Sequence, residues 1–217
     1  MKRNTLILIL SLTVSVAYSQ TLHLNPGSSV SKLDWLYYDG QISEKYYENP
    51  RLGYSLSVGL EYIEHKYFSV SSDVLIYNCG GENSSEVKTD PFRLMGPEKI
   101  SVSYLALGSA FNFNPINNKF KVQLSIGPRI EYMIYGSKKE PYKWIDNSKG
   151  LNKFNYGVTA GAGLYYDIKK YIVGINAQYL YRIKKLAEVQ ATYDSPGVDA
   201  TEQVIIFGFS FGYRLKY

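Results

Sequence analysis

The side chains best suited to chemistry are few in this chain and poorly placed for catalysis. The run Gly208-Phe209-Ser210-Phe211-Gly212 matches the Gly-x-Ser-x-Gly pattern of a nucleophile elbow. That chemistry needs a sharp turn from a strand into a helix and a histidine that follows the serine. Here Ser210 lies within a strand-like stretch, and the only two histidines, His23 and His65, both precede it. We therefore expect no catalytic residue and no enzyme.

The sequence also gives little evidence for a metal-binding or cofactor-binding site. The single cysteine, Cys79, excludes a cysteine-based zinc cluster and an intrachain disulfide. The chain also lacks a phosphate-binding glycine-rich loop with its lysine. Cys79 begins a polar stretch, so we expect it in an exposed loop, either passive or free to form an intermolecular bond. We expect no metal-binding and no cofactor-binding residue.

The N-terminus predicts export from the cytoplasm. Lys2 and Arg3 precede the short apolar run 6–17, and Ala17-Tyr18-Ser19 has the small-x-small pattern of a signal-peptidase site. We therefore expect a signal peptide at residues 1–19 and one mature domain at residues 20–217. A buried N-terminal helix and an uncleaved anchor are the alternatives. The mature chain would carry 22 basic against 19 acidic residues, a charge too small to suggest a nucleic-acid partner.

The mature chain alternates between apolar and polar residues almost throughout, which is typical of β-strands. Phe120–Ile134 is the clearest case, because its even positions are apolar and its odd positions as far as Glu131 are polar or glycine. Ile100–Phe113 changes phase near Tyr104-Leu105, which predicts a bulge. Leu22–Leu33, interrupted by Pro26, is the weakest candidate. With these, about eight strands are predicted, the others being Leu52–Tyr62, Phe68–Tyr77, Phe154–Tyr166, Tyr171–Ile183 and Ile205–Tyr217.

The connections between these strands are alternately short and long. Short turns are expected at Glu64–Lys66, Asn114–Lys119 and Lys169–Lys170. The long polar loops are expected at Asp34–Pro50, Cys79–Pro97, Gly136–Lys153 and Lys184–Thr201. This layout predicts an all-β fold, a single up-and-down antiparallel barrel with both termini on one side. Short periplasmic turns and long outer loops are the arrangement of bacterial outer-membrane barrels.

The apolar faces of the strands predict which side of the barrel is outside. A continuous apolar surface of this size would aggregate in water, whereas a bilayer requires it. Tyrosines near the strand ends on this face suit the two membrane interfaces: Tyr54, Tyr62, Tyr132, Tyr156, Tyr166, Tyr171, Tyr181, Tyr213 and Tyr217. A soluble ligand-binding barrel or a β-sandwich, which would bury these faces, is the alternative.

The opposite faces of the strands should line the lumen. They bring four acids and three arginines together, which nearly balance in charge: Glu61, Asp73, Glu131, Asp167, Arg129, Arg182 and Arg214. Buried charges are tolerated only when they are paired and hydrogen-bonded. Because an eight-stranded barrel is just wide enough to be filled by side chains, we expect a structural network of ion pairs that fills the lumen. A narrow pore is the alternative.

Several segments are similar to the PorT-like outer-membrane β-barrel family. Gly127-Pro128-Arg129 and Tyr156–Tyr166 resemble its two most recognisable strands, and Gly174–Arg182 and Phe207–Tyr217 are similar to its last two. Leu24–Ser31 resembles its first strand. The resemblance implies an eight-stranded barrel in the outer membrane of a Gram-negative cell, in a family whose namesake is tied to protein secretion. The terminal Tyr217 resembles the signal read by the barrel-assembly machinery.

The function expected is a structural or interaction role at the cell surface, exerted through the long loops. Lys138-Lys139 and Lys184-Lys185 could pair with phosphates of lipopolysaccharide at the outer rim. We expect a monomer in contact with outer-membrane lipid, and a protein partner could dock on the loops. The alternatives are a narrow pore, a secretion-associated component, and a lipid-modifying rim enzyme that would depend on His23.

Overall fold

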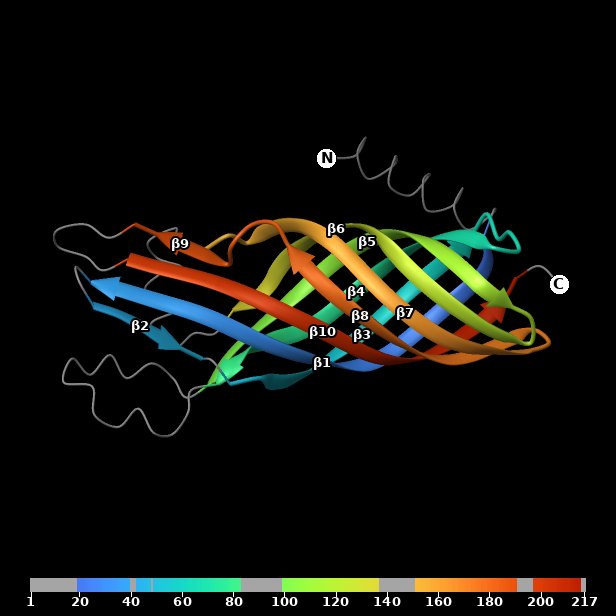
Figure 1. Ribbon diagram of the computed structural model, residues 1–217, viewed down its shortest axis with the longest axis horizontal. Helices are drawn as coiled ribbons and strands as arrows, with labels where there is room; N and C mark the ends of the chain where they lie inside the picture. Colours follow the sequence, from blue (N-terminus) through green and yellow to red (C-terminus); the bar gives the residue numbers. More distant parts are fainter. Residues whose placement is uncertain are drawn as a thin grey trace.

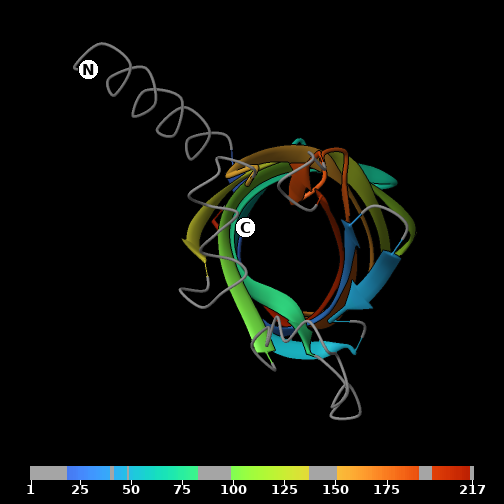
Figure 2. The same cartoon turned by 90° about the vertical axis from the view of Figure 1, so that its left-hand side faces the viewer.

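The computed structural model describes residues 19–39, 42–47, 49–82, 99–136, 151–190 and 197–215. They form one closed antiparallel β-barrel, seen from the side in Figure 1 and along its axis in Figure 2. Its eight strands are β1 (Ser19–Asp39), β3 (Arg51–Tyr62), β4 (Phe68–Glu82), β5 (Lys99–Asn117), β6 (Phe120–Gly136), β7 (Phe154–Ile168), β8 (Tyr171–Arg182) and β10 (Gly197–Arg214). Pairing of β1 with β10 closes the barrel. The expected signal peptide lies almost wholly outside the described residues.

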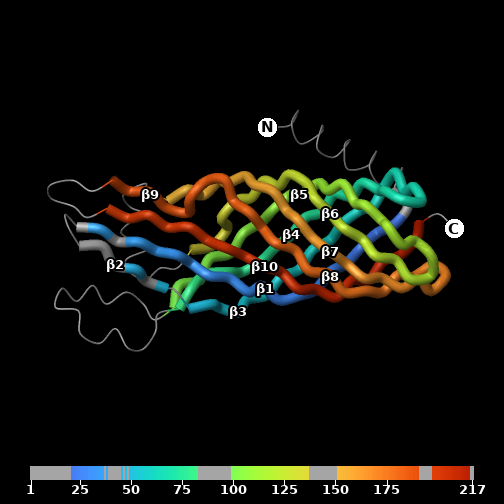
Figure 3. The backbone as a smooth tube through the Cα atoms, in the orientation of Figure 1, coloured from blue at the N-terminus to red at the C-terminus, as the bar shows by residue number. Residues whose placement is uncertain are grey.

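Two short strands extend the sheet at one end of the barrel. Strand β2 (Ile42–Tyr46) pairs with the end of β1, and β9 (Ala187–Val189) pairs with the start of β10. The tight turns of the β3–β4, β5–β6 and β7–β8 hairpins lie at the opposite end, where β1 begins and β10 ends (Figure 3). The predicted up-and-down topology with both ends of the barrel sheet on the turn side is therefore confirmed.

The alternation of the sequence explains the two faces of the barrel wall. Along β3 the even positions point outward, and Leu52 and Tyr54 are 74% and 58% exposed, whereas Ser55 and Ser57 are buried. The same outward apolar face recurs on every long strand, with residues such as Leu124, Ile126, Ile175, Phe207 and Phe209 exposed. Among the described residues, no helix is long and apolar enough to cross a membrane. Most of the predicted girdle tyrosines are exposed; Tyr62 is half-buried and bonded to Ser72, and Tyr217 lies outside the described residues.

The bulge predicted in β5 near Tyr104 is wrong, and the first strand is longer than predicted. The β5–β6 register does shift between Ser103 and Tyr104, but the extra residue is Ile134 of β6. Strand β5 keeps its phase, because Val102, Tyr104 and Ala106 are all buried, and only the polarity of its two faces inverts. Strand β1 runs through Pro26, whose missing N–H faces a short gap in the ladder with β10. Proline therefore interrupts one ladder without ending the strand.

Three expected loops are wrong in part, because the strands continue beyond the apolar band. Strand β1 extends to Asp39, β4 to Glu82, and β10 begins at Gly197. In these extensions the alternation inverts: Lys32 and Asp34 point outward and pair with each other, while Leu33 and Trp35 are buried inside. Outside a bilayer the barrel wall meets water, so polar residues face out and apolar residues face in. In the membrane segment, outward positions are apolar. When the same rule is applied beyond that segment, the polar outward residues break the pattern, and the stretch is predicted as a polar loop.

The interior at this end is an apolar core, not the polar lumen expected throughout. Its fully buried members come from β1, β4, β5, β10 and the segments beside β2 and β9, and include Leu33, Trp35, Tyr47, Cys79, Ile100, Val102, Leu186, Val198 and Ala200. Cys79, expected in an exposed loop, is instead in β4 with no exposed surface, and its thiol faces the Val102 carbonyl at 3.6 Å. The expectation for Cys79 was therefore wrong, because β4 continues inward past it.

Candidate functional site

A cluster of buried charges crosses the lumen directly below the apolar core. Arg129 Nε donates to Glu131 Oε2 at 3.1 Å, and the Tyr77 hydroxyl donates to the same oxygen at 2.7 Å. Arg182 of β8 donates to Glu131 of β6, to Glu202 of β10 and, at 2.7 Å, to the Tyr77 hydroxyl of β4. The four charged side chains are at most 4% exposed. Strands β4 and β8 lie on opposite sides of the ring, so these contacts span the barrel.

Two stacked tyrosines complete this layer, which we call the ion layer (Tyr77, Tyr104, Arg129, Glu131, Arg182 and Glu202). The rings of Tyr77 and Tyr104 are stacked with centroids 5.4 Å apart, and the Arg182 guanidinium carbon lies 4.1 Å from the Tyr104 centroid. A guanidinium over an aromatic face is attracted to its quadrupole. Two arginines and two glutamates balance in charge. The ion layer is therefore neutral, hydrogen-bonded and closely packed.

A second polar cluster lies nearer the turn end of the barrel. Glu61 of β3 accepts hydrogen bonds from Lys121 Nζ of β6 at 3.0 Å and from Ser69, and it lies 3.0 Å from His23 Nε2 of β1. The side chains of Glu61 and Lys121 are each 3% exposed. Close by, Arg214 Nη2 donates to Asp167 Oδ2 at 2.6 Å in a more exposed pair. These contacts tie the strands together across the lumen.

The structure brings the seven predicted lumen residues into separate groups. Arg129, Glu131 and Arg182 share the ion layer, Asp167 and Arg214 form a pair, and Glu61 has other partners. Asp73 points into the cavity between the two clusters, where its carboxylate lies beside Gly108. The partners missed from the sequence are His23, Tyr77, Tyr104, Lys121 and Glu202. Lys121 lies on the polar phase of a predicted strand, and Glu202 continues the polar phase of β10, so strand phase could have found both.

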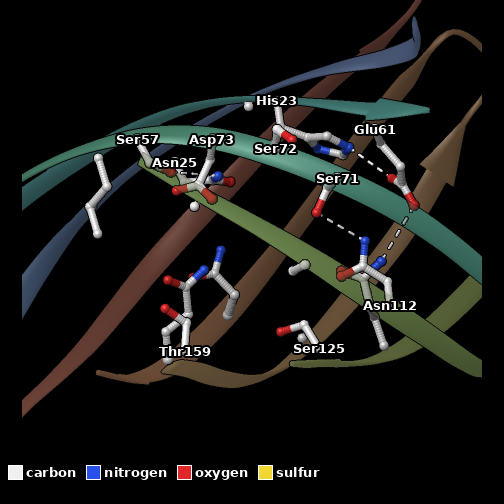
Figure 4. Close-up of a pocket in the computed structure, with 18 of the residues that line it drawn as sticks. His23, Asn25, Ser57, Glu61, Ser71, Ser72, Asp73, Asn112, Ser125 and Thr159 are labelled. Carbon is white, nitrogen blue, oxygen red and sulfur yellow. Dashed lines mark hydrogen bonds and ion pairs between the residues drawn. The ribbon is translucent and has the colours of Figure 1, made fainter. Parts of the chain in front are cut away.

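The cavity between the clusters is small and polar. It has a volume of about 80 Å³ and is lined mainly by hydroxyl, amide and glycine residues (Figure 4). In this view His23 points toward Glu61, and Asn112 donates to the Ser71 hydroxyl at 3.1 Å. A cavity of this volume can hold a few water molecules, each with several polar partners. The polar half of the lumen therefore has room for water between the two clusters.

The candidate catalytic residues do not form an active site in the described part of the chain. Ser210 lies inside β10 with no turn near it, so the geometry of a nucleophile elbow is missing. His23 is engaged with Glu61, and His65 lies in the exposed β3–β4 turn with its ring stacked 4.9 Å from Phe68. Across the described residues, no three His, Cys, Asp or Glu side chains are grouped to hold a metal ion.

The lysines expected at the outer rim are described only in part. Lys185 pairs with Asp199 and lies 3.8 Å from Glu188, and the ammonium of Lys184 lies 5.4 Å from the Tyr156 ring centroid. The hydrogen bond to the Asp199 carboxylate raises the pKa of Lys185. Lys138-Lys139 lies outside the described residues. Lys185 therefore already has acidic partners in the protein.

Comparison with known proteins places this barrel in a family. Residues 10–188 match the family model described as "Outer membrane protein beta-barrel domain". The chain belongs to this family and is a bacterial outer-membrane β-barrel protein. The soluble barrel and the sandwich are thereby excluded. Barrels of this family are generally non-enzymatic.

Two solved structures illustrate the similarity. The crystal structure of OprG from Pseudomonas aeruginosa is 12% identical, with 91% of this chain and 97% of that chain covered and a TM-score of 0.58. The NMR structure of the Escherichia coli outer membrane protein W is 16% identical, with 91% and 98% covered and a TM-score of 0.42. The likeness to OprG supports the fold. A search of curated proteins gives no match.

Proposed function

We propose that this protein is a non-conducting outer-membrane barrel that serves as a structural and interaction component of the cell surface. The observation that carries the proposal is the ion layer with the apolar core packed on it. A hydrated ion moving along the axis would have to separate Arg182 from Glu131 and Glu202 and then cross a region where Leu33, Trp35 and Ile100 are at most 1% exposed. Either step is costly, because it leaves charges unpaired or places an ion among apolar groups.

The extracellular end of the barrel is the surface proposed for interaction. The strands rise beyond the apolar band there, and β2 and β9 widen the sheet. Polar outward residues such as Thr201 and Gln203 are available to a partner protein at this level. We propose that the loops contact such a partner and that outer-membrane lipid and lipopolysaccharide surround the wall. A monomer folded by the barrel-assembly machinery is part of the same proposal.

The resemblance to PorT-like barrels supports a second candidate, a component associated with protein secretion. Gly127-Pro128-Arg129 lies in β6 and Tyr156–Tyr166 in the neighbouring β7, so the resembling segments are adjacent in the barrel. A closed lumen suits an accessory role better than a conduit. Loss of secreted proteins from the medium after gene deletion, with normal outer-membrane integrity, would favour this candidate over a purely structural one.

The proposal is tested by the permeability of the purified barrel. Proteoliposomes that hold the folded protein should swell in arabinose or glycine no faster than protein-free liposomes. An outer-membrane porin reconstituted at the same protein-to-lipid ratio serves as the open control. Swelling that increases with the amount of this protein would contradict the closed lumen and favour the narrow pore. Unchanged lipid A after gene deletion is expected if the protein is not a lipid-modifying enzyme.

A further inference from the structure

The ladder between β3 and β4 is interrupted in the upper part of the barrel wall. The two strands are paired from Tyr62 and Val70 as far as Ser55 and Tyr77. Beyond that point β3 continues to Arg51 and stays paired with β1, and β4 continues to Glu82 and stays paired with β5. No β3–β4 pair is formed from Asn78 to Gly81, and the seam closes again at the bridge between Glu82 and Asn49. Backbone groups left unpaired in a membrane are costly, so the break needs other partners.

Specific side chains satisfy the backbone at the break. Ser29 of β1 donates to the Asn78 carbonyl, and Ser31 donates to the Gly80 carbonyl at 2.9 Å while accepting from the Gly80 N–H at 2.8 Å. Arg51 Nη1 donates to the Ile100 carbonyl at 2.8 Å. Strand β4 thus bends inward across β3 toward β1. The bend is encoded by the sequence, because polar residues stand where the ladder lacks its own bonds.

The inward bend leaves a groove on the outer surface of the wall. Its volume is about 620 Å³, and its rim carries the exposed apolar and aromatic side chains Leu52, Tyr54, Ile134 and Tyr135. Its floor is polar: Asn78 Nδ2 donates to the hydroxyls of Ser101 and Ser103, both at 2.9 Å, and Arg51 lies at its end. A polar floor with an apolar rim suits an amphiphile rather than a purely apolar chain.

The height of the groove along the barrel axis also supports an amphiphilic ligand. Leu52 is paired with Val30, one of the last apolar outward positions of β1, and Arg51 is paired with Ser31, next to the outward Lys32. On β10 the outward face changes from Ile205 to Gln203 at the same height, because Val30 and Ile205 are partners. The groove therefore straddles the outer boundary of the membrane, where lipid headgroups meet their acyl chains.

The charges at this boundary favour an anionic headgroup. Lys32 is paired with Asp34 at 2.9 Å and Lys99 with Glu82 at 3.0 Å. Arg51 donates to backbone carbonyls, and no carboxylate pairs with it among the described residues. This leaves one uncompensated positive charge in the groove. Guanidinium groups bind phosphate with good geometry.

We propose that this groove, defined by Arg51, Leu52, Tyr54, Asn78, Ser101 and Ile134, binds a phosphorylated, acylated glycolipid of the outer leaflet, the lipid A part of lipopolysaccharide. A phosphate lies toward Arg51, and an acyl chain follows Leu52 and Ile134 toward the apolar band. The inference rests on the membrane position of the barrel and not on the closed lumen. It is more specific than the lipid contact proposed for the whole wall, because only the seam between β3 and β4 forms this site.

The test is lipid retention by the full-length protein in detergent, measured by native mass spectrometry after equilibration with lipid A. We expect one lipid A per wild-type barrel. Arg51→Gln removes the charge and Ser101→Trp fills the groove, and each should lower retention at least fivefold. Lys119→Gln, which removes an exposed lysine from the turn end, is the matched control and should retain lipid A as the wild type does.

A heat-dependent gel shift of each variant verifies that the barrel has folded, and Ser101→Trp keeps the test decisive if Arg51→Gln fails to fold. Lipid A stripped of its phosphates should be retained several-fold less by the wild type. Equal retention by the wild type and Ser101→Trp would overturn the site. Equal retention of the phosphate-free lipid, or of phosphatidylethanolamine, would overturn the proposed ligand.

Discussion

The guanidinium carbon of Arg182 lies 4.1 Å from the ring centroid of Tyr104, while its nitrogens pair with Glu131 and Glu202 on two other strands. One side chain therefore joins β8 to β5, β6 and β10 through the middle of the lumen. The relationship explains how the barrel interior can hold four charged side chains that are at most 4% exposed. It also makes Arg182 the residue on which the ion layer depends most.

Arg182→Ala should destabilise the barrel strongly. The substitution leaves two buried glutamates without their shared partner. Removing one partner of a buried ion pair lowers the free energy of unfolding by about 3–5 kcal/mol. Arg214→Ala is the matched control, because the Arg214–Asp167 pair is more exposed and should be worth about 1 kcal/mol or less. Urea unfolding followed by the gel shift measures both. Equal shifts of the two midpoints would contradict the role of the ion layer.

Gly53→Ala should impair folding because of the seam between β3 and β4. A Cβ at Gly53 would lie 2.1 Å from the Asn78 carbonyl oxygen, a backbone atom that cannot move aside cheaply. Overpacking of this kind costs about 1–3 kcal/mol. At Gly59 in the same strand the nearest atoms are 3.2 Å from the Cβ position, so Gly59→Ala should be tolerated better. The yield of heat-modifiable protein after refolding distinguishes the two variants.

Strand phase explains how much could be predicted from the sequence. The membrane segments of β3, β6, β7, β8 and β10 follow directly from period two, since each residue must face lipid or lumen. The extension of β1 could not be predicted in the same way, because Leu33 and Trp35 point inward where the exterior is water, and the pattern inverts. The partners of Arg182 could not be predicted either, since Tyr77 is 105 positions away and only barrel closure brings them together.

Cys79 should resist modification in the folded protein. Its side chain has no exposed surface, and β4 and β5 enclose it at the bend. A membrane-impermeant maleimide added to intact cells should leave Cys79 unlabelled and react only after denaturation. Glu188→Cys in a Cys79→Ser background is the positive control, because the side chain of Glu188 in β9 is 62% exposed. Rapid labelling of wild-type Cys79 would contradict the inward course of β4.

Glu64 in the β3–β4 turn should make the barrel less stable as pH rises. Burial, and then the nearby Glu61 charge, raise the pKa of Glu64 above its ordinary value of 4.5. Between that value and the raised one, the folded state binds more protons than the unfolded state, so stability falls as pH increases. Glu64→Gln should therefore raise the free energy of unfolding at pH 7, measured by urea unfolding, by less than about 1 kcal/mol for a partly exposed group. The gain should vanish at pH 3.5; a gain that grows in acid would contradict the assignment.

The most direct test of the closed lumen is the ion conductance of single barrels in a planar bilayer. Wild-type protein that shows the heat-dependent gel shift should insert without discrete conductance steps. A triple variant removes three large rings from the apolar core and the ion layer: Trp35→Ala, Tyr47→Ala and Tyr104→Ala. It should show small, reproducible conductance steps once its folding is verified in the same way. Steady conductance steps from the wild type, comparable to those of the triple variant, would contradict the closed barrel.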